Sequence, residues 1–259
     1  AVAACRQDPV PPTVEPAIEA VQTTYAPDQR VARFEVAARA TAEGVVLEGE
    51  TNLPAAKSDL LDRLERAGQA VIDRITVLPA PELEGAEYGV VRLSVCNIRS
   101  EARHSAELST QATLGTPLRI YKESEGWFLV QTPDGYFGWL DPGGFQKMTE
   151  AEYEKWRVAE KVVFLPDFGF SFAAPSAEAA PVSDLLAGNI LRLLASAGDY
   201  LRVGYPDGRE AFVLADQVMP YGEWLASRRP EAGPILATAR SFLGRPYLWG
   251  GTSGKGVDC

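Results

Sequence analysis

Residues 115–140 have the sequence GTPLRIYKESEGWFLVQTPDGYFGWL, and residues 188–213 follow the same pattern with GNILRLLASAGDYLRVGYPDGREAFV. The paired glycines, Leu-Arg steps, aromatic residues and Pro-Asp-Gly triplets are all 73 positions apart, without a gap. Proline presets a turn and the glycine after it accepts a positive φ, so each copy predicts two strands joined by a turn. The sequence therefore predicts a duplication that gives two short all-β barrels, over 86–148 and 160–221.

Aromatic residues occupy equivalent places before and after the turn of each copy. They are Trp127 and Tyr200 before the turns, and Trp139 and Phe212 after them. Aromatic residues on strands usually pack inside the protein, so we expect them in the barrel cores rather than as platforms for sugar stacking. The segment between the barrels, 149–160, predicts a linking helix.

Upstream of the duplication, residues 14–80 show helical and strand patterns in the order α-β-β-α-β. The first helix is expected over 14–24, and a second one to be capped by Ser58 and ended by Gly68. Strands are expected over 31–40, around 45–47 and over 71–78. This order indicates a small sheet covered on one face by helices, and it loosely resembles the envelope domain called BON.

Composition excludes several classes of function. The 259 residues carry 35 acidic and 25 basic side chains, a net charge of −10, which disfavours binding to nucleic acid. No run approaches the roughly 18 to 20 apolar residues of a membrane-spanning helix. Three cysteines do not make a disulfide framework or a zinc site, and a single histidine, His104, excludes any site that needs two imidazoles. We expect no metal and no organic cofactor.

The first residues suggest an anchor. Small residues precede Cys5, and a proline-rich polar segment follows it, so that 1–13 resembles the tether of a bacterial lipoprotein whose cysteine carries the lipid. The alternative is a disordered N-terminus with an incidental cysteine. The lipoprotein interpretation predicts a protein of the cell envelope, periplasmic or anchored at the outer membrane.

One short stretch has the pattern of a catalytic motif: residues 245–259, RPYLWGGTSGKGVDC. It follows a helix predicted over 231–243. A glycine-rich loop lets the backbone approach a substrate closely, and a cysteine that opens a helix has its thiolate stabilised by the helix dipole. A neighbouring carboxylate would raise the thiol pKa, so Asp258 needs another task, such as holding a cationic group of the substrate.

These residues resemble the NlpC-type family of papain-like cell-wall cysteine peptidases, whose signature is Pro-Tyr-x-Trp-Gly-Gly followed by Asp-Cys. With two SH3-like domains upstream, the chain resembles the γ-D-glutamyl-L-diamino acid endopeptidases. The resemblance implies an α+β, multi-domain chain: a small α/β sandwich, two SH3-like β-barrels, and over 229–259 the N-terminal part of a papain-like catalytic domain. It also implies cleavage of murein stem peptides whose L-alanine amine is free.

The resemblance assigns roles residue by residue. Cys259 matches the nucleophile, Asp258 and Tyr247 line the substrate pocket, and Trp249 forms its aromatic wall. In the first barrel, Glu107 and Tyr136 are the candidates for reading the free amine together with Asp258. On composition alone, Glu107 is an ordinary surface carboxylate.

One part of the machinery has no counterpart. The family supplies the histidine and a third polar group downstream of the cysteine, and His104 lies in the first SH3-like segment, where we expect it to face solvent. The chain as given is therefore expected to be inactive, and 231–259 to pack poorly. Two other functions stay open: an N-acetylmuramoyl-L-alanine amidase on the same scaffold, and a non-catalytic lipoprotein that binds murein. We expect a monomer.

Overall fold

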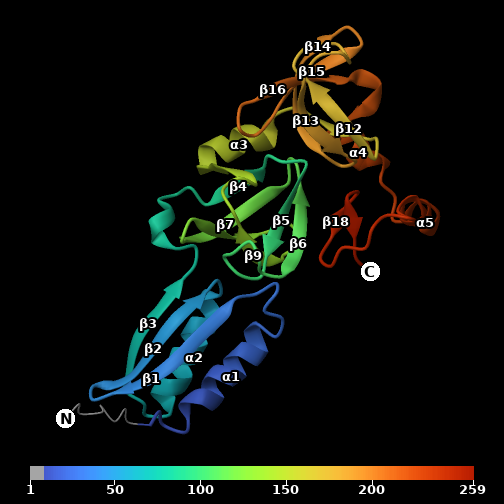
Figure 1. Ribbon diagram of the computed structural model, residues 1–259. Coiled ribbons are helices and arrows are strands. Elements are labelled where there is room, and N and C mark those ends of the chain that lie inside the picture. Colours follow the sequence, from blue (N-terminus) through green and yellow to red (C-terminus); the bar gives the residue numbers. More distant parts are fainter. Residues whose placement is uncertain (1–8) are drawn as a thin grey trace. The chain divides into compact units, whose positions relative to one another are not determined.

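The computed structural model describes residues 9–259, so Cys5 lies outside the described residues. The chain divides into two compact units, one ending at Leu83 and the other beginning at Glu84. Both contain helices and sheets, which confirms the mixed α+β class (Figure 1). Within residues 9–259, no helix is long and apolar enough to cross a membrane.

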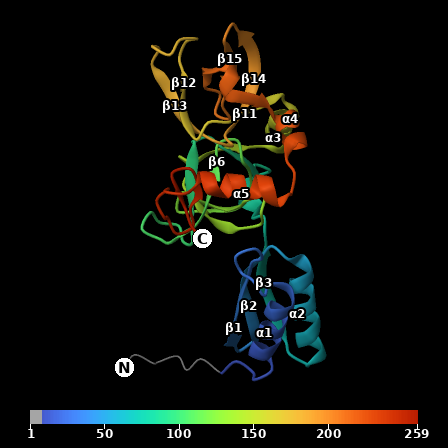
Figure 2. The same ribbon diagram turned by 90° about the vertical axis from the view of Figure 1, so that its right-hand side faces the viewer.

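The first unit has the predicted α-β-β-α-β order. Its elements are α1 (Val14–Tyr25), β1 (Phe34–Thr41), β2 (Gly44–Thr51), α2 (Pro54–Arg66) and β3 (Val71–Val77), followed by a short 3-10 helix, Pro81–Leu83. In the sheet, β2 is central, antiparallel to β1 and parallel to β3. Figure 2 shows α1 and α2 packed beside this sheet, and their apolar residues form one core with those of the strands, including Ile18, Leu60 and Leu47.

The prediction that Ser58 caps α2 is wrong. The helix begins four residues earlier, at Pro54, because proline at the first position lacks an N–H and its φ already suits a helix. Ser58 lies inside the helix, where its hydroxyl donates to the carbonyl of Pro54 at 3.2 Å. The predicted end is confirmed: Gly68 has φ +70°, and its N–H bonds to the carbonyl of Glu65 at 2.9 Å.

The second unit, which is described throughout, contains two seven-stranded sheets. The first is made of β4 (Tyr88–Val91), β5 (Val95–Arg99), β6 (Leu108–Thr113), β7 (Pro117–Ser124), β8 (Trp127–Gln131), β9 (Phe137–Leu140) and β10 (Phe145–Met148). The second is made of β11 (Lys161–Phe164), β12 (Phe168–Phe172), β13 (Pro181–Leu186), β14 (Ile190–Ala197), β15 (Tyr200–Gly204), β16 (Glu210–Leu214) and β17 (Val218–Pro220). We call these sheets, with their loops, the first and the second repeat.

The two repeats share their architecture strand by strand. Each strand of the second repeat begins 73 residues after its counterpart in the first repeat. The first pair of strands begins at Tyr88 and Lys161, and the last pair at Phe145 and Val218. Strand order is also the same, β10-β4-β7-β8-β9-β5-β6 against β17-β11-β14-β15-β16-β12-β13. Even the register shifts correspond, after Ile120 in β7 and after Leu193 in β14. The duplication predicted from the sequence is therefore present in the structure.

Helices follow each repeat. Helix α3 (Glu150–Val158) begins with a capping box between Thr149 and Glu152, and its Trp156 packs on Val90 and Met148 of the first sheet. After the second sheet come a short 3-10 helix (Ala215–Gln217), α4 (Tyr221–Ser227) and α5 (Ala232–Ser241). Two further strands, β18 (Thr252–Ser253) and β19 (Gly256–Val257), form a small hairpin after α5.

The repeats are joined by direct contacts near Leu114. This residue follows β6, yet its side chain is fully buried in the core of the second repeat. Its carbonyl accepts the N–H of Ile190 at 2.9 Å. Gly115 sits at φ +87°, and a Cβ there would lie 2.5 Å from the carbonyl oxygen of Ile190. Its counterpart Gly188 has φ +88°, but among the described residues nothing comes within 4 Å of a Cβ built there.

The four repeat aromatics are less uniformly buried than predicted. Trp139 is 9% exposed and lies in the core, as expected. Trp127, Tyr200 and Phe212 are only half-buried, because such small sheets cannot enclose every large ring. Trp127 contacts the ring of His104 edge-on, with centroids 4.9 Å apart.

Candidate active site

Residues 245–258 form a closed glycine-rich loop after α5, which we call the catalytic-motif loop. The hairpin of β18 and β19 is its centre, and the N–H of Leu248 bonds to the carbonyl of Val257 at 2.9 Å. Gly250 has φ +70°, and a Cβ on it would lie 2.6 Å from the carbonyl oxygen of Leu108. A Cβ on Gly251 would lie 2.6 Å from the carbonyl oxygen of Gly256. A side chain at either glycine of the Trp-Gly-Gly signature would therefore clash with the backbone, so both positions require glycine.

The loop rests on the first repeat through Gln111 of β6. The side-chain oxygen of Gln111 accepts the N–H of Thr252 and the hydroxyl of Ser253, each at 3.1 Å. The amide nitrogen of Gln111 donates to the side-chain oxygen of Asn97 at 2.9 Å, which fixes its orientation. Gln111 is 8% exposed, so these bonds are formed away from water. Sequence reasoning did not predict this contact, because Gln111 and Thr252 are 141 residues apart.

Asp258 closes the loop. One oxygen of its carboxylate accepts the N–H of Gly250 at 2.9 Å, and its own N–H donates to the carbonyl of Gly251 at 3.0 Å. The side chain is exposed, and Cys259 beside it is an exposed free thiol. Asp258 therefore has a structural task that the sequence did not reveal, namely holding together the loop that ends at the cysteine.

Tyr247 lies next to this pair. Burial of part of its ring, followed by the nearby ionisable groups of Cys259 and Asp258, raises the pKa of Tyr247 above its ordinary value. The phenol is protonated at neutral pH, as an ordinary tyrosine is, and can donate a hydrogen bond. Tyr247 and Trp249 are 63% and 59% exposed, so both rings are open to a ligand.

The first repeat brings Glu107 towards the loop. Glu107 is exposed and immediately precedes Leu108, whose carbonyl packs against Gly250. Its backbone carbonyl accepts the N–H of Ser100 at 2.9 Å, which fixes the start of β6. The structure thus groups Tyr247, Asp258 and Cys259, with the Glu107 segment against the same loop.

Two other predicted residues, Tyr136 and His104, lie between strands of the first repeat. Tyr136 is half-buried in the turn between β8 and β9, where its carbonyl accepts the N–H of Thr132 at 3.0 Å. His104 is exposed and packs on Trp127, as expected for a residue facing solvent. Within residues 9–259, no cluster of three or more His, Cys, Asp or Glu side chains is arranged to hold a metal ion.

Two basic side chains of the loop form ion pairs with the second repeat. Arg245 pairs with Asp167 and also donates to the carbonyl of Gly254 at 3.4 Å. Lys255 pairs with Asp184 at 2.8 Å and donates to the hydroxyl of Ser94 at 3.3 Å. Sequence reasoning missed Asp167, Asp184 and Ser94 as partners, because these residues are far from the loop in the chain.

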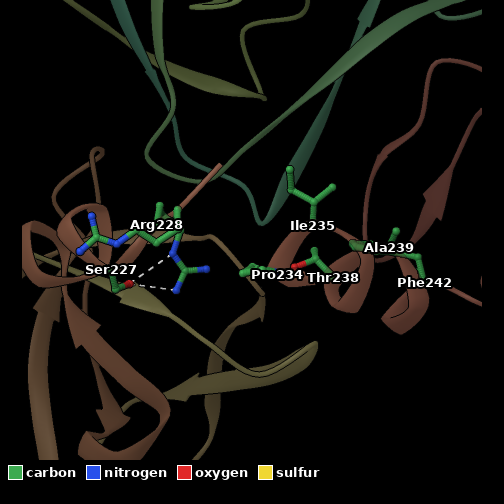
Figure 3. A pocket seen from close by; sticks show the side chains of 8 residues that line it. Ser227, Arg228, Pro234, Ile235, Thr238, Ala239 and Phe242 are labelled. Carbon is green, nitrogen blue, oxygen red and sulfur yellow. Dashed lines mark hydrogen bonds between the residues drawn. The ribbon is translucent and has the colours of Figure 1, made fainter. Parts of the chain in front are cut away.

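The prediction that 231–259 packs poorly holds for the helix but not for the loop. Every residue of α5 is exposed, including Ile235 at 57% and Leu236 at 52%. Between the end of α4 and α5 lies an open cavity of about 470 Å³, lined by apolar side chains such as Phe242 and by Arg228, which bonds to Ser227 (Figure 3). None of the predicted site residues lines this cavity.

Comparisons with known proteins show which proteins this chain is similar to. Residues 98–143 match the family described as the bacterial dipeptidyl-peptidase Sh3 domain. The chain is 27% identical over 160 residues to the gamma-D-glutamyl-L-lysine dipeptidyl-peptidase of Bacillus subtilis, and 28% identical over 161 residues to the protein of that name from Bacillus cereus. Each alignment covers 59% of this chain, and 50% and 47% of these relatives. The chain thus spans about half the length of these curated relatives.

A solved structure shows the same fold. An NlpC/P60 family protein from Bacillus cereus superposes with a TM-score of 0.52 and 22% identity, covering 66% of this chain and 68% of that one. Dipeptidyl-peptidase 6 of Lysinibacillus sphaericus is 24% identical over 176 residues, covering 66% of this chain and 65% of the relative. The chain is thus similar to NlpC-type peptidases that carry a bacterial SH3 domain, and residues 98–143 match that domain.

Proposed function

We propose that the full-length protein is a cysteine endopeptidase that cleaves murein stem peptides at the bond between γ-D-glutamate and the diamino acid. The observation that carries the proposal is the grouping of Cys259 with Tyr247 and Asp258 on a loop fixed to β6. The names of the relatives, gamma-D-glutamyl-L-lysine dipeptidyl-peptidases, support the type of bond.

The reaction follows from a thiol nucleophile. The thiolate of Cys259 attacks the carbonyl carbon of the γ-D-glutamyl amide and forms a tetrahedral oxyanion. Collapse of the oxyanion breaks the C–N bond, and the amine of the diamino acid leaves with a proton from a general acid. Water then hydrolyses the thioester, which frees the carboxylate and restores the thiol. No step requires a redox partner.

The general base is a group other than His104. That imidazole is exposed and packs on Trp127 of the first repeat. A cysteine peptidase needs a histidine within hydrogen-bond reach of its thiol. We therefore do not assign the role of general base to His104.

The free amine of L-alanine is the proposed specificity determinant. Glu107 precedes the segment on which Gly250 packs, and Asp258 has a second carboxylate oxygen besides the one that accepts from Gly250. Two carboxylates would offset the charge of one ammonium group, and the Tyr247 phenol oxygen would accept one of its hydrogens. Trp249 and Tyr136 would border the same pocket. An acetylated amine carries no charge and would be excluded.

The same proposal includes a location in the cell envelope, with a lipid on Cys5 as anchor and a monomer as the working form. The substrate, murein, is found there. A Cys5→Ser variant that moves from the membrane fraction to the soluble fraction of cells would support the anchor. An unchanged distribution would leave Cys5 as an incidental cysteine in a terminal tether.

Peptide hydrolysis tests the activity. Full-length protein and its Cys259→Ala variant are incubated with L-Ala-γ-D-Glu-diaminopimelate, its lysine analogue and the N-acetylated forms, and products are identified by mass. We expect cleavage of the free-amine peptides only, lost by at least about a thousandfold in the variant. Equal cleavage of acetylated peptides would remove the amine clamp. In parallel incubations with intact murein, release of the stem peptide from muramic acid would make the protein an amidase, and retention of murein without cleavage a binding protein.

A further inference from the structure

The catalytic-motif loop is held by the same two positions of both repeats. Ser94 and Asp167 are equivalent, since they are 73 residues apart, and so are Gln111 and Asp184. All four side chains bind the loop between residues 245 and 255. Each repeat therefore contacts the same loop through the same two positions. Figure 1 shows β18, which belongs to this loop, beside β6.

The first repeat uses neutral groups at these positions. Gln111 accepts from the backbone of Thr252 and from the hydroxyl of Ser253, both at 3.1 Å. Ser94 accepts from Lys255 at 3.3 Å and donates its own hydrogen to Asp184 at 2.8 Å. These bonds fix the centre of the loop to the edge of the first sheet.

The second repeat uses charge instead. Asp167 pairs with Arg245, at the start of the loop, and Asp184 pairs with Lys255 at 2.8 Å, near its end. The two pairs therefore bracket the segment that the first repeat holds in the middle. Ser94 joins both sets of contacts, because it bonds to Asp184 and to Lys255.

The charge on Asp184 is secure at neutral pH. Partial burial alone would raise the pKa of this carboxyl, but hydrogen bonds from Lys255 and Ser94 outweigh that effect, so its pKa lies below its ordinary value. In the Lys255–Asp184 pair the side chains are 46% and 30% exposed, so this pair is partly shielded from water. In the Arg245–Asp167 pair the arginine is 27% exposed but the aspartate 61%, so we expect the smaller contribution from this pair.

We infer that Asp167 and Asp184 are positioning residues for the proposed active site: through Arg245 and Lys255, the second repeat sets the place of the loop that carries Asp258 and Cys259. Glycine restricts the backbone little at positions 250 and 251, so the place of the loop depends on its contacts. Bonds on one side alone would leave it free to tilt about Gln111. Ion pairs at both ends remove that freedom. The link to catalysis rests on the proposed function, but the positioning itself does not.

Hydrogen exchange tests the positioning without any assay of activity. Exchange of the amides of 245–258 is measured by mass spectrometry in the full-length protein, in Asp184→Asn, in Asp167→Asn and in the double variant. We expect the amides to exchange about three- to fivefold faster in each single variant, and faster still in the double variant. The expected effect is modest because the ion pairs are partly exposed. Unchanged exchange in the double variant would overturn the inference.

Matched variants separate position from general destabilisation. Glu178→Gln removes an exposed carboxylate from the loop between β12 and β13 and should leave exchange of 245–258 unchanged. Asp184→Glu keeps the charge and should restore most of the protection. Exchanging the partners, Asp184→Lys with Lys255→Asp, should be closer to the natural protein than either single change. Failure of both rescues would overturn the role of the ion pair.

Kinetics then connect position to chemistry. If the natural protein cleaves the peptide, Asp184→Asn should lower kcat about threefold or more, with KM changed less, because a displaced thiol affects attack more than binding. A normal kcat alongside faster exchange would overturn the role in catalysis. If the natural protein cleaves no peptide, the proposed function fails, while the exchange data still decide whether the second repeat positions the loop.

Discussion

The two repeats of the second unit have the same backbone but different neighbours. Their strands start 73 residues apart and follow the same order, yet Leu114 of the first repeat lies in the core of the second, while the equivalent Ala187 is exposed. At the loop, a neutral Gln111 corresponds to a charged Asp184. The comparison teaches that turns and strand alternation preserve the fold of a duplicated module, while single side chains give each copy its own contacts.

The largest effect should come from Leu114→Ala, which gives the first repeat the residue of the second. A fully buried leucine replaced by alanine leaves a cavity and should lower the free energy of unfolding by about 2–5 kcal/mol. Urea unfolding of the full-length protein measures the loss. Leu243→Ala is the control, since that side chain is 80% exposed and its removal should change little. Equal effects of both changes would contradict the shared core.

Substituting the two equivalent glycines should separate backbone strain from crowding. Both sit near φ +87°, where alanine costs about 1–2 kcal/mol. Only Gly115→Ala also places a Cβ 2.5 Å from the carbonyl oxygen of Ile190, which should add about 1–3 kcal/mol. Thermal unfolding of Gly115→Ala and Gly188→Ala gives the comparison. The same melting temperature for both variants would show that Ile190 can move away from residue 115 without loss of stability.

A smaller change is expected from Gln111→Asp, which introduces the chemistry of the second repeat into the first. The shorter carboxylate cannot donate to Asn97, and at a position 8% exposed it would be charged without a basic partner among its present contacts. We expect a loss of about 1–3 kcal/mol in unfolding free energy. The reciprocal Asp184→Gln should cost less, because that position is more exposed. The opposite ranking would overturn the distinction between neutral and charged anchoring.

The smallest effect is the pH dependence of the Asp184 pair. Because the pKa of Asp184 is lower in the folded protein, the pair contributes stability above the unfolded pKa, near 3.8, and loses it as the pH falls through the folded value. Asp184→Asn should therefore lower the melting temperature at pH 6, which corresponds to a loss of less than about 1 kcal/mol in unfolding free energy. The difference between the two proteins should shrink as the pH falls below 3.8 and the Asp184 carboxyl becomes protonated. A difference that grows in acid would contradict the direction of the pKa shift.

The sequence predicted what short-range chemistry determines. Pro-Asp-Gly turns and alternating strands revealed the duplication, and Gly68 marked the end of α2. Ser58 was misassigned because a proline four residues earlier starts the helix, and both residue types favour helix beginnings. The half-buried Trp127 and Tyr200 were expected in the core because residue type alone does not reveal how much a small sheet can cover.

The candidate site was predicted only in part. Its motif is local, so Tyr247, Asp258 and Cys259 could be named, and the structure groups them. The supports of the loop could not be named, because Gln111 and Thr252 are 141 residues apart and nothing in either segment marks the other. Aligning the repeats would have shown that Gln111 and Asp184 are equivalent, but not that both face the same loop.

The burial of Leu114 in the second repeat also affects how the chain folds while it is being synthesised. The strands that cover Leu114 leave the ribosome about one repeat, 73 residues, after its own sheet. At roughly 5–20 residues per second, this delay lasts about 4–15 s, far longer than the formation of a hairpin. During that interval the first repeat presents an uncovered leucine beside an open strand edge, so this is the stage at which the nascent protein most needs protection from aggregation.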